Sequence, residues 1–370
     1  MEDIKSLRIN IDEIDSDIMN LFEKRMETVE KIADAKKAKN ISLSDEDREK
    51  AVIENAVLKS AKFKGETELF VNSLIAVSKM RQRKLIYAEN EFSFSKSCQI
   101  LKDISDIKVA YQGVPGAWAQ IACNKMFLGA DIYNIESGFE AVFKEVKEGN
   151  ADFGVIPIEN SHTGAIGEVY DLLGKYGCYI TRQEWIDINH CVMVNEGVKL
   201  NDIREVLSHP EVFKQCSKYL DSKAWDLTAC KNTAIAAQTV LEKKDKRIAA
   251  IGSLSAAKIY GLEVVKTDII NDPTNKTRFI AISKEPIYDK SCKTVSLKII
   301  TAHKSGALMN ALFPFMANGV NLSRIESRPI YGGKYGFFID LEGNIEDVNI
   351  KSAIQMCMNE CSYLEILGCF

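Results

Sequence analysis

The chain has 370 residues, 46% of them hydrophobic, so it can bury a sizeable core, and its length predicts two or three domains. The net charge of −4, the charged N-terminus and the lack of a long apolar run exclude a basic nucleic-acid-binding protein and predict a cytoplasmic protein with no nucleic-acid or membrane partner. Ten cysteines without a C-x-x-C pair and four histidines without metal-ligand spacing predict neither a disulfide framework nor a metal or other cofactor.

Residues 1–90 contain no proline and no strand-like alternation, which predicts a helical domain. Apolar residues that alternate steps of three and four form a coiled-coil-like seam, made of Ile4, Leu7, Ile11, Ile14, Ile18 and Leu21. Continued to residue 39, this helix would be about 50 Å long, so part of it must pack on another chain. We expect Ser44 to cap a second helix, with Asp47 three residues later, and a third helix over residues 66–87.

Polar residues interrupt the apolar stripes of these helices. Four residues beyond the seam lies Arg25, and Lys36 follows eleven residues later on the same face. The second and third helices place further polar residues at helical spacing, namely Asp45, Arg48, Glu49, Ser78 and Gln82. Each could be a surface ion pair or a register device. Together they predict a bundle that binds an anionic ligand, because buried charges need partners.

With Leu7-Arg8 added, this set resembles the all-helical chorismate mutases over residues 1–88. The resemblance implies the rearrangement of chorismate to prephenate, which depends on orientation and electrostatic stabilisation and needs no nucleophile. It also implies that Arg8 and Arg25 grip the two carboxylates, with Arg48 nearby. Arg8 and Arg25 are seventeen residues apart on one helix, about 25 Å. Both can therefore reach one small ligand only if Arg8 comes from the second chain of an antiparallel dimer.

The same resemblance assigns the other polar residues of the bundle. It implies that Lys36 and Gln82 donate hydrogen bonds to the ether oxygen, where negative charge grows as the C–O bond breaks. Asp45, Glu49 and Ser78 would hold the ring hydroxyl and the local network. The loop before the third helix is shorter than in some members of the family, and the assignment of Ser78 and Gln82 allows for that gap.

From Lys108 onward, short apolar runs alternate with helix-like segments, which is typical of an α/β fold, and residues 89–97 predict a linker before it. The runs are Val109–Tyr111, Phe153–Ile156, Val192–Val194, Val206–Leu207, Ile248–Ile251 and Phe279–Ile282. Several motifs follow or enter these strands, where open α/β sheets form their ligand crevices. They are Gly113-Val-Pro-Gly116, Pro157-Ile-Glu159-Asn160-Ser161-x-x-Gly164, Ser208-His209-Pro210 with Gln215, Asn232-Thr233-Ala234 and Thr277-Arg278-Phe279.

In this order the motifs resemble the prephenate dehydratases over residues 107–285. The resemblance implies two α/β lobes with prephenate between them, Thr277 as the acid or hydrogen-bond donor to the departing hydroxyl, and Arg278 as the cation. It assigns the ring and the carboxylates to Asn160, Ser161, Ser208, Gln215 and Thr233. Helix N-termini would add N–H donors for carboxylates. The chain departs from the family at Ala117-Trp118-Ala119, where hydroxyl residues are usual, so contacts made by such hydroxyls would be missing.

The C-terminal segment, residues 293–370, predicts the order βαββαβ of a small ferredoxin-like domain. The expected elements are Thr294–Ile300, Gly306–Ala317, Asn321–Arg328, Tyr335–Leu341, Asn349–Glu360 and Tyr363–Leu367. Two motifs resemble the amino-acid-binding ACT domains, and they contribute Gly306, Ala307, Leu308, Glu326, Ser327 and Arg328. The resemblance implies that phenylalanine binds between paired domains, close to the backbone of Gly306.

The sequence therefore predicts three domains: an all-α mutase domain at 1–90, a two-lobed α/β dehydratase domain at 107–285 and an α+β ACT domain at 293–370. We expect a homodimer or larger oligomer that converts chorismate to prephenate and then to phenylpyruvate, inhibited by phenylalanine. Two alternatives remain at this point. The helical domain could serve dimerisation and regulation only, or the whole chain could be a non-catalytic, two-lobed amino-acid-binding protein.

Overall fold

The computed structural model describes residues 3–39, 41, 45–86, 104–330 and 334–370. Ser44 and residues 89–97, predicted as a helix cap and as a linker, lie outside the described residues. The cap of the second helix is Asp45, whose side chain accepts a hydrogen bond from the backbone N–H of Arg48 at 3.0 Å. No helix in the described part of the chain is both long and apolar enough to cross a bilayer.

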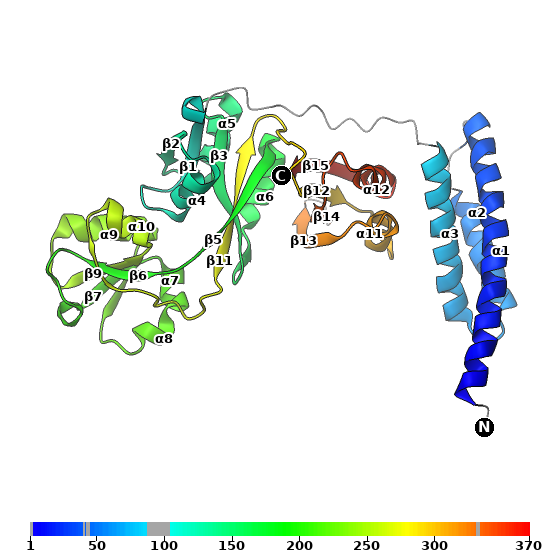
Figure 1. Ribbon diagram of the computed structural model, residues 1–370, viewed down its shortest axis with the longest axis horizontal. Helices are drawn as coiled ribbons and strands as arrows, with labels where there is room; N and C mark the ends of the chain where they lie inside the picture. Colours follow the sequence, from blue (N-terminus) through cyan, green and yellow to red (C-terminus); the bar gives the residue numbers. More distant parts are fainter. Residues whose placement is uncertain (1–2, 40, 42–44, 87–103, 331–333) are drawn as a thin grey trace.

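The N-terminal helices form a bundle in which α3 packs against both of the others (Figure 1). They are α1 (Ile4–Lys39), α2 (Glu46–Lys59) and α3 (Lys64–Ile86), close to the predicted bounds. Of the described residues of α1, only Val29 and Ala33 are buried. The residues of the predicted apolar seam lie on the surface of the bundle, and Ile4 and Leu21 are both 66% exposed. Half of this helix therefore presents an apolar face that the described chain does not cover.

The first α/β lobe, here lobe 1, has a mixed sheet in the order β5-β11-β3-β1-β2. Its strands are β1 (Lys108–Gln112), β2 (Asp131–Ile135), β3 (Phe153–Asn160), β4 (Gly164–Ala165, paired with β3), β5 (Tyr179–Asp187) and β11 (Lys276–Ser283). Its helices are η1 (Ile104–Asp106), α4 (Trp118–Met126), α5 (Phe139–Glu148) and α6 (Gly167–Tyr176). Separate apolar clusters fill the two faces of the sheet, one beneath α5 and α6 and the other beneath α4.

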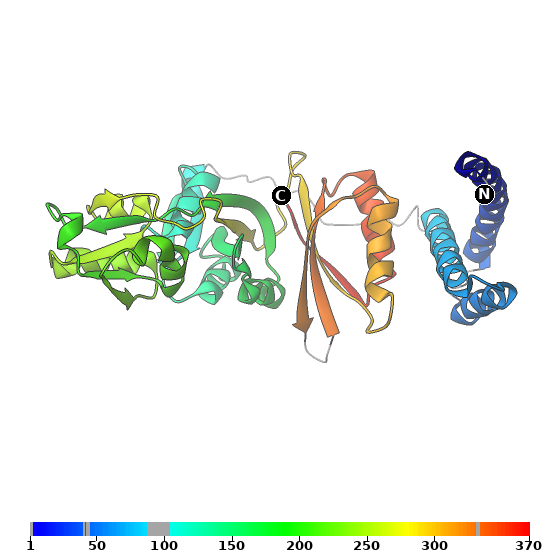
Figure 2. The same cartoon turned by 90° about the horizontal axis from the view of Figure 1, so that it is seen from below.

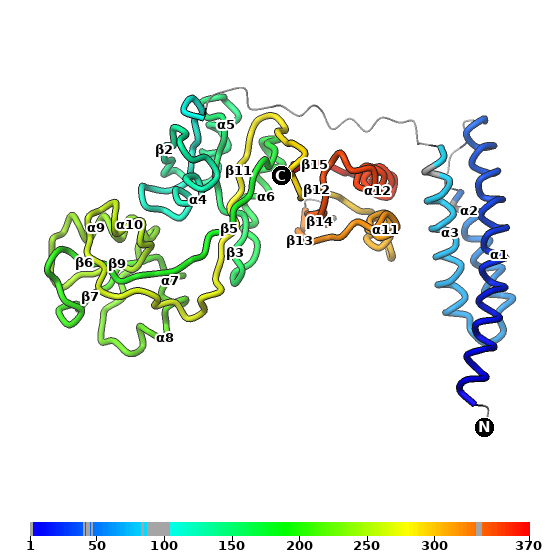
Figure 3. Tube along the Cα trace, in the orientation of Figure 1, coloured from blue at the N-terminus to red at the C-terminus, as the bar shows by residue number. Residues whose placement is uncertain are grey.

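The second lobe, here lobe 2, is an insertion between β5 and β11, so the chain crosses between the lobes twice (Figure 3). Its sheet has the order β10-β6-β9-β7-β8. The strands are β6 (Cys191–Val194), β7 (Glu205–Ser208), β8 (Asp226–Ala229), β9 (Ile248–Gly252) and β10 (Glu263–Lys266). The helices are η2 (Leu200–Asp202), α7 (Pro210–Gln215), α8 (Ser217–Leu220), α9 (Thr233–Lys243) and α10 (Leu254–Ile259). Two α/β lobes are what the resemblance implied for this region, whereas the double crossing of the chain was not predicted.

The C-terminal region has the predicted order βαββαβ, with the strands arranged β13-β14-β12-β15 as in ferredoxin-like folds. Its elements are β12 (Thr294–Ile300), α11 (Ala307–Ala317), β13 (Leu322–Ile330), β14 (Lys334–Glu342), α12 (Val348–Met358) and β15 (Tyr363–Cys369). The two helices cover one face of this sheet (Figure 2). The edge strand β15 pairs in parallel with β5, so the sheet continues into lobe 1. No pattern in the sequence predicted this continuous sheet.

Candidate active sites

A cavity of about 300 Å³ lies between the two lobes. Lobe 1 lines it with β3, β11 and the beginning of α4, and lobe 2 with α7 and the beginning of α9. Four residues predicted from the sequence line it, namely Asn160, Gln215, Thr233 and Thr277. Its described lining contains neither lysine nor arginine. Any negative charge in the cavity must therefore be stabilised by neutral donors and by backbone N–H groups.

A β-bulge determines which side chains reach this cavity. Arg278 lies opposite Glu159, but the next residue, Phe279, lies opposite Pro157, so Ile158 is an extra residue on β3. Side chains alternate between the two faces of a strand, so one extra residue turns those after it to the opposite face. The sequence predicted a loop after residue 156. The strand instead continues to residue 160, because β11 still pairs with it.

The bulge places Asn160 directly opposite Thr277, and both line the cavity. The Asn160 Nδ2 donates to Thr277 Oγ1 at 3.0 Å and to Asn275 Oδ1 at 2.7 Å. Its Oδ1 accepts from the backbone N–H groups of His162 and Thr163 at 3.0 and 3.1 Å. The Asn160 amide is thus fully occupied by protein groups. Thr277 Oγ1 acts as an acceptor toward Asn160, which leaves its own O–H proton for a ligand in the cavity.

Gln215 and His190 form a second polar pair in the cavity, and the sequence analysis did not select His190. His190 Nε2 lies 3.1 Å from Gln215 Oε1. Burial lowers the pKa of His190 to about 4, although the hydrogen bond to Gln215 partly offsets it, so the ring is neutral near pH 7. Because Gln215 accepts, Nε2 carries the proton, and Nδ1 is a buried acceptor without a protein partner among the described residues. The Trp118 ring meets His190 edge-on at 5.9 Å.

Two predicted substrate contacts lie elsewhere. Ser208 is fully buried, and its Oγ donates to the carbonyl of Ile251 at 2.7 Å. Ser161 Oγ accepts from the backbone N–H of Lys276 at 3.0 Å. Neither residue lines the cavity. Both hydroxyls hold backbone segments that carry cavity residues, and their predicted contact with the substrate stays a prediction.

The structure does not bring Arg278 to the cavity, so its role as the cation for the substrate stays a prediction that this geometry does not favour. Thr277 and Arg278 are neighbours on β11, so they point to opposite faces of the sheet. The Arg278 side chain is 6% exposed, and its Nη1 binds Asp340 of the C-terminal region at 2.7 Å. The alternation of a strand was a usable signal here, because Thr277 and Arg278 cannot both face one cavity.

The beginnings of two helices also line the cavity. Asn232 caps α9 by accepting a hydrogen bond from the N–H of Ile235 at 2.8 Å. At the start of α4 the cap position is Ala117, which makes no side-chain capping bond. No side chain at the cap position therefore competes with a ligand for the N–H groups of the first turn of α4. This is the Ala117-Trp118-Ala119 segment at which the sequence departs from the family, and all three residues line the cavity.

The turn before α4 packs against lobe 2. Gly113 and Gly116 have φ values of +121° and +89°, which L side chains rarely adopt. A Cβ on Gly116 would lie 2.9 Å from the Cα of Ala256 in lobe 2. Ser253 donates to the carbonyl of Gly116 at 3.0 Å, which ties α10 to the turn. Gly116 is thus needed for the close approach of the lobes.

The helical bundle gathers part of its predicted site within one chain. Arg25 Nη1 donates to Ser78 Oγ and to the carbonyl of Leu74. Desolvation lowers the pKa of Arg25. Gln82 lies one turn beyond Ser78 on α3 and is buried, and its Oε1 has no protein partner among the described residues. Glu49 pairs with Lys79 at 3.0 Å, a residue that the sequence analysis did not select.

The other predicted residues of the bundle lie at its surface or edge. Asp45 and Arg48 are exposed at the beginning of α2, and Lys36 is half-buried near the end of α1. Arg8 is exposed on the first turns of α1, seventeen residues before Arg25 on the same unbroken helix. One chain does not bring Arg8 to the other residues.

The two C-terminal motifs lie on different parts of their domain. Gly306 has a φ of +76° before α11, and open space surrounds the position of a Cβ there. Ala307 is buried, and Leu308 is half-buried. On β13 the burial pattern alternates, so Glu326 and Arg328 share one face with Arg324, and Ser327 lies on the other. Within one chain the structure does not gather the six predicted effector residues around one cavity.

Comparisons with known proteins found relatives that match most of the chain. The family described as prephenate dehydratase matches residues 109–287, and type II chorismate mutase matches residues 7–83. A bifunctional chorismate mutase/prephenate dehydratase from Enterobacter agglomerans is 29% identical and covers 99% of this chain and 95% of its own length. Arogenate dehydratase/prephenate dehydratase 1 from Arabidopsis thaliana is 34% identical over 72% of this chain and 73% of its own. The solved structure of the prephenate dehydratase from Arthrobacter aurescens in complex with L-Phe covers 71% of this chain and 89% of its own, with 28% identity and a TM-score of 0.66.

Proposed function

The chain belongs to the bifunctional chorismate mutase/prephenate dehydratases, and we propose that its bundle and its interlobe cavity carry out the two reactions in series. Chorismate becomes prephenate in the bundle, and prephenate becomes phenylpyruvate, CO₂ and water in the cavity. The observation that carries the second step is the Asn160–Thr277 pair, which presents one hydroxyl proton to a cavity lined without cations.

The dehydratase reaction needs a donor at the leaving hydroxyl. The bond between the ring and its carboxylate breaks, its electron pair enters the ring to restore aromaticity, and the C–O bond to the hydroxyl breaks on the opposite side. The hydroxyl leaves as water, so it must gain a proton as the bond breaks. Thr277 donates a hydrogen bond to this oxygen, and Asn160 holds the Thr277 Oγ1 in place at 3.0 Å.

The carboxylates of prephenate bind at the helix beginnings. The first turns of α4 and α9 both line the cavity, and each offers backbone N–H groups and the positive end of a helix dipole. Gln215 and Thr233 add neutral donors on the lobe 2 side. The backbone of Ala117-Trp118-Ala119 replaces the hydroxyl contacts that are usual in the family.

The cavity favours prephenate over arogenate, the substrate in which an amino group replaces the keto group. An ammonium group calls for a carboxylate partner. The acid among the residues lining the cavity is Glu211, which is already paired with Lys214 at 3.0 Å. We therefore expect kcat/KM for prephenate to exceed that for arogenate by at least tenfold, measured with each substrate separately on the purified chain. A preference for arogenate would overturn this assignment.

The bundle site supports the mutase reaction through positioned cations and amides. Arg25, held by Ser78, takes one carboxylate, and Arg8 with Arg48 takes the other. Lys36 and Gln82 donate to the ether oxygen as its negative charge grows. Asp45 and Glu49 hold the ring hydroxyl and the network around it. The desolvation that lowers the pKa of Arg25 supports this role, because a partly buried cation favours an anionic ligand.

We place Arg8 in the site of a second copy of this chain. Its separation from Arg25 on α1 is about 25 Å, at 1.5 Å per residue, which exceeds the size of the substrate. The exposed seam from Ile4 to Leu21 gives the first half of α1 an apolar face of its own. An antiparallel pair of these helices buries both seams and brings Arg8 of one copy to Arg25 of the other. The protein acts as a homodimer or a multiple of it.

Phenylalanine binds the C-terminal region and inhibits the dehydratase. The Arthrobacter relative is solved in complex with L-Phe, and Gly306 offers an open backbone position of the kind an amino-acid ligand can approach. Glu326, Ser327 and Arg328 complete the pocket in a pair of C-terminal regions. Inhibition requires that phenylalanine bind one conformation of the chain better than another.

Gly306→Ala should raise the phenylalanine concentration for half-inhibition at least tenfold, because the added Cβ occupies the space next to the bound backbone. Gly319→Ala is a matched control. Gly319 also has a positive φ, +67°, and open space around its Cβ position, so it carries the same backbone strain without the proposed contact. Dehydratase rates at increasing phenylalanine test both variants. Equal shifts in the two variants would show that strain, and not a contact at Gly306, sets the inhibition.

Neither alternative, a helical domain for dimerisation and regulation only or a non-catalytic amino-acid-binding protein, accounts for these observations as well. A bundle that serves dimerisation alone would not need to resemble the type II chorismate mutases, yet residues 7–83 match that family. A non-catalytic binding protein would not need the Thr277 hydroxyl as a hydrogen-bond donor in the cavity. The cytoplasmic location predicted from the sequence stays a prediction, and so do the domain boundaries and the lack of a cofactor.

A further inference from the structure

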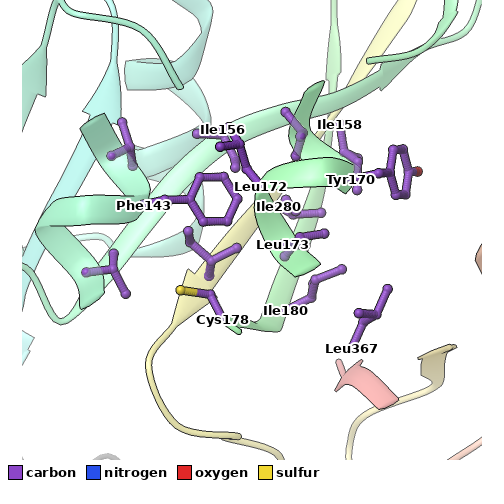
Figure 4. Close-up of a cluster of buried hydrophobic side chains, with 14 of the residues drawn as sticks. Phe143, Ile156, Ile158, Tyr170, Leu172, Leu173, Cys178, Ile180, Ile280 and Leu367 are labelled. Atoms are coloured by element: carbon purple, nitrogen blue, oxygen red, sulfur yellow. The ribbon is translucent and has the colours of Figure 1, made fainter. Parts of the chain in front are cut away.

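The C-terminal region packs directly against the face of lobe 1 that lies behind the catalytic pair. β15 pairs with β5 at Gly368 and Ile180, where a Cβ on Gly368 would lie 2.0 Å from the Ile180 carbonyl oxygen. Leu367 and Phe338 of the C-terminal region belong to the same apolar cluster as α6 and the back of β11 (Figure 4). The two parts therefore share a hydrophobic core.

Four charged side chains cross this shared core, and we name them the interdomain clasp: Glu159 and Arg278 from lobe 1, and Arg324 and Asp340 from the C-terminal region. Arg278 Nη1 lies 2.7 Å from Asp340 Oδ2, and Arg324 Nε lies 2.5 Å from Glu159 Oε2. All four side chains are 16% exposed or less. Arg324 also donates to the hydroxyl of Tyr170 and lies over its ring.

The close charge pairs of the clasp all run between lobe 1 and the C-terminal region. Each side contributes one acid and one base, and the two short contacts both run from one side to the other. Within lobe 1, Arg278 and Glu159 are 3.8 Å apart, beyond hydrogen-bond distance. A buried charge that loses its partner is strongly destabilised. Glu159 and Arg278 thus depend on the C-terminal region for their closest partners.

The clasp is one residue away from the catalytic pair on both strands. Glu159 precedes Asn160 on β3, and Arg278 follows Thr277 on β11. The register places Arg278 opposite Glu159 and Thr277 opposite Asn160, with the bulge adjoining them. The bulge breaks the regular ladder here, so the strands alone fix this segment less firmly. The cavity face and the clasp face are therefore the two sides of one short, irregular piece of sheet.

We propose that the C-terminal region holds Thr277 and Asn160 in their reactive geometry through the clasp, which makes Asp340 and Arg324 positioning residues of the dehydratase. The proposal rests on the dehydratase function assigned above. It gives the C-terminal region a part in catalysis even without phenylalanine. A chain ending before β12 would lack both partners of Glu159 and Arg278 and should be a poor dehydratase, not merely an insensitive one.

Asp340→Asn removes the charge opposite Arg278 while keeping the shape of the side chain. We expect dehydratase kcat to fall at least tenfold, with a smaller change in KM, because the substrate still binds at the helix beginnings while Thr277 is displaced. Glu159→Gln should act in the same way from the lobe 1 side. Glu184→Gln is its matched control, since Glu184 pairs with Lys125 at 3.2 Å within lobe 1 and makes no clasp contact. That control should stay within twofold of wild type.

A double-mutant cycle with Thr277→Ala separates positioning from general destabilisation. If the clasp acts through Thr277, Asp340→Asn should lower kcat by less than twofold once Thr277 is already alanine. Mutase activity of the same chains reports the amount of chain with a folded helical bundle, and thermal unfolding of each variant shows whether the dehydratase lobes are folded. If Asp340→Asn does not fold, the cycle of Glu159→Gln with Thr277→Ala takes its place.

Two outcomes would overturn the clasp proposal. The first is a kcat within twofold of wild type for both Asp340→Asn and Glu159→Gln. The second is an equal loss from Asp340→Asn in the wild-type and Thr277→Ala backgrounds, which would mean that the clasp acts on something other than Thr277. Failure of the dehydratase assignment itself is recognised separately, as a wild-type chain that does not convert prephenate.

Discussion

Thr277→Ala should lower the dehydratase turnover number by a factor on the order of 10² or more. The mutation removes the one proton that the catalytic pair presents to the cavity, because the Asn160 amide is fully used by protein groups. Mutase turnover should stay near the wild-type value, since Thr277 lies on β11 and the mutase residues lie on α1, α2 and α3. Rates with prephenate and with chorismate, measured on the same preparation, test both statements.

Thr277→Ser is the control for this prediction. It keeps the hydroxyl that accepts from Asn160 and loses only a methyl group, so it should retain far more activity than the alanine variant. A Thr277→Ala chain that keeps most of its dehydratase turnover would remove Thr277 from the mechanism. Equal losses in the serine and alanine variants would indicate that packing of the methyl group matters and the proton does not.

Two inactive mutase variants should restore activity to each other when they share a dimer. Arg8→Ala damages the residue that we assign to the partner's site, and Glu49→Ala damages a residue of the chain's own site. In a mixed dimer one site collects both defects and the other collects neither. Random reassortment makes about half of the dimers mixed, so about a quarter of all mutase sites should be intact.

The experiment is to unfold the two variants together, refold them, and compare their mutase activity with that of each variant refolded alone. Chain exchange is shown independently by capturing one variant through an affinity tag and detecting the other. Activity near a quarter of wild type supports the shared site. No gain over the controls, with exchange demonstrated, would place Arg8 outside the site and leave the exposed seam of α1 without a catalytic consequence.

The helices and the order of the elements could be predicted from local patterns. The long helix α1 and the βαββαβ order of the C-terminal region both follow from hydrophobic periodicity, and the structure confirms them within a few residues. Strands β2, β5, β8 and β10 were missed, because polar residues interrupt each of them and leave no continuous apolar run. Pro210 lies in the first turn of α7 and Asn232 caps α9, as capping chemistry favours for these residue types.

The site could be predicted only in part, because it depends on contacts distant in sequence. Asn160 and Thr277 are separated by 117 positions, and a single bulge decides that they face each other. His190 carries no motif, and only the fold reveals its contact with Gln215. The clasp joins residues that are 62 positions or more apart, so no local pattern could indicate it. The alternation of side chains along β11 could have shown that Arg278 and its neighbour Thr277 point to opposite faces of the sheet.

The most direct test of the account supplies chorismate to the purified chain and follows prephenate and phenylpyruvate over time. The account predicts that the wild-type chain forms prephenate first and then phenylpyruvate without any added enzyme. It predicts that the Thr277→Ala chain consumes chorismate at the wild-type rate and accumulates prephenate. A wild-type chain that leaves chorismate untouched, or a Thr277→Ala chain that forms phenylpyruvate as fast as wild type, would contradict the assignment of two sites in series.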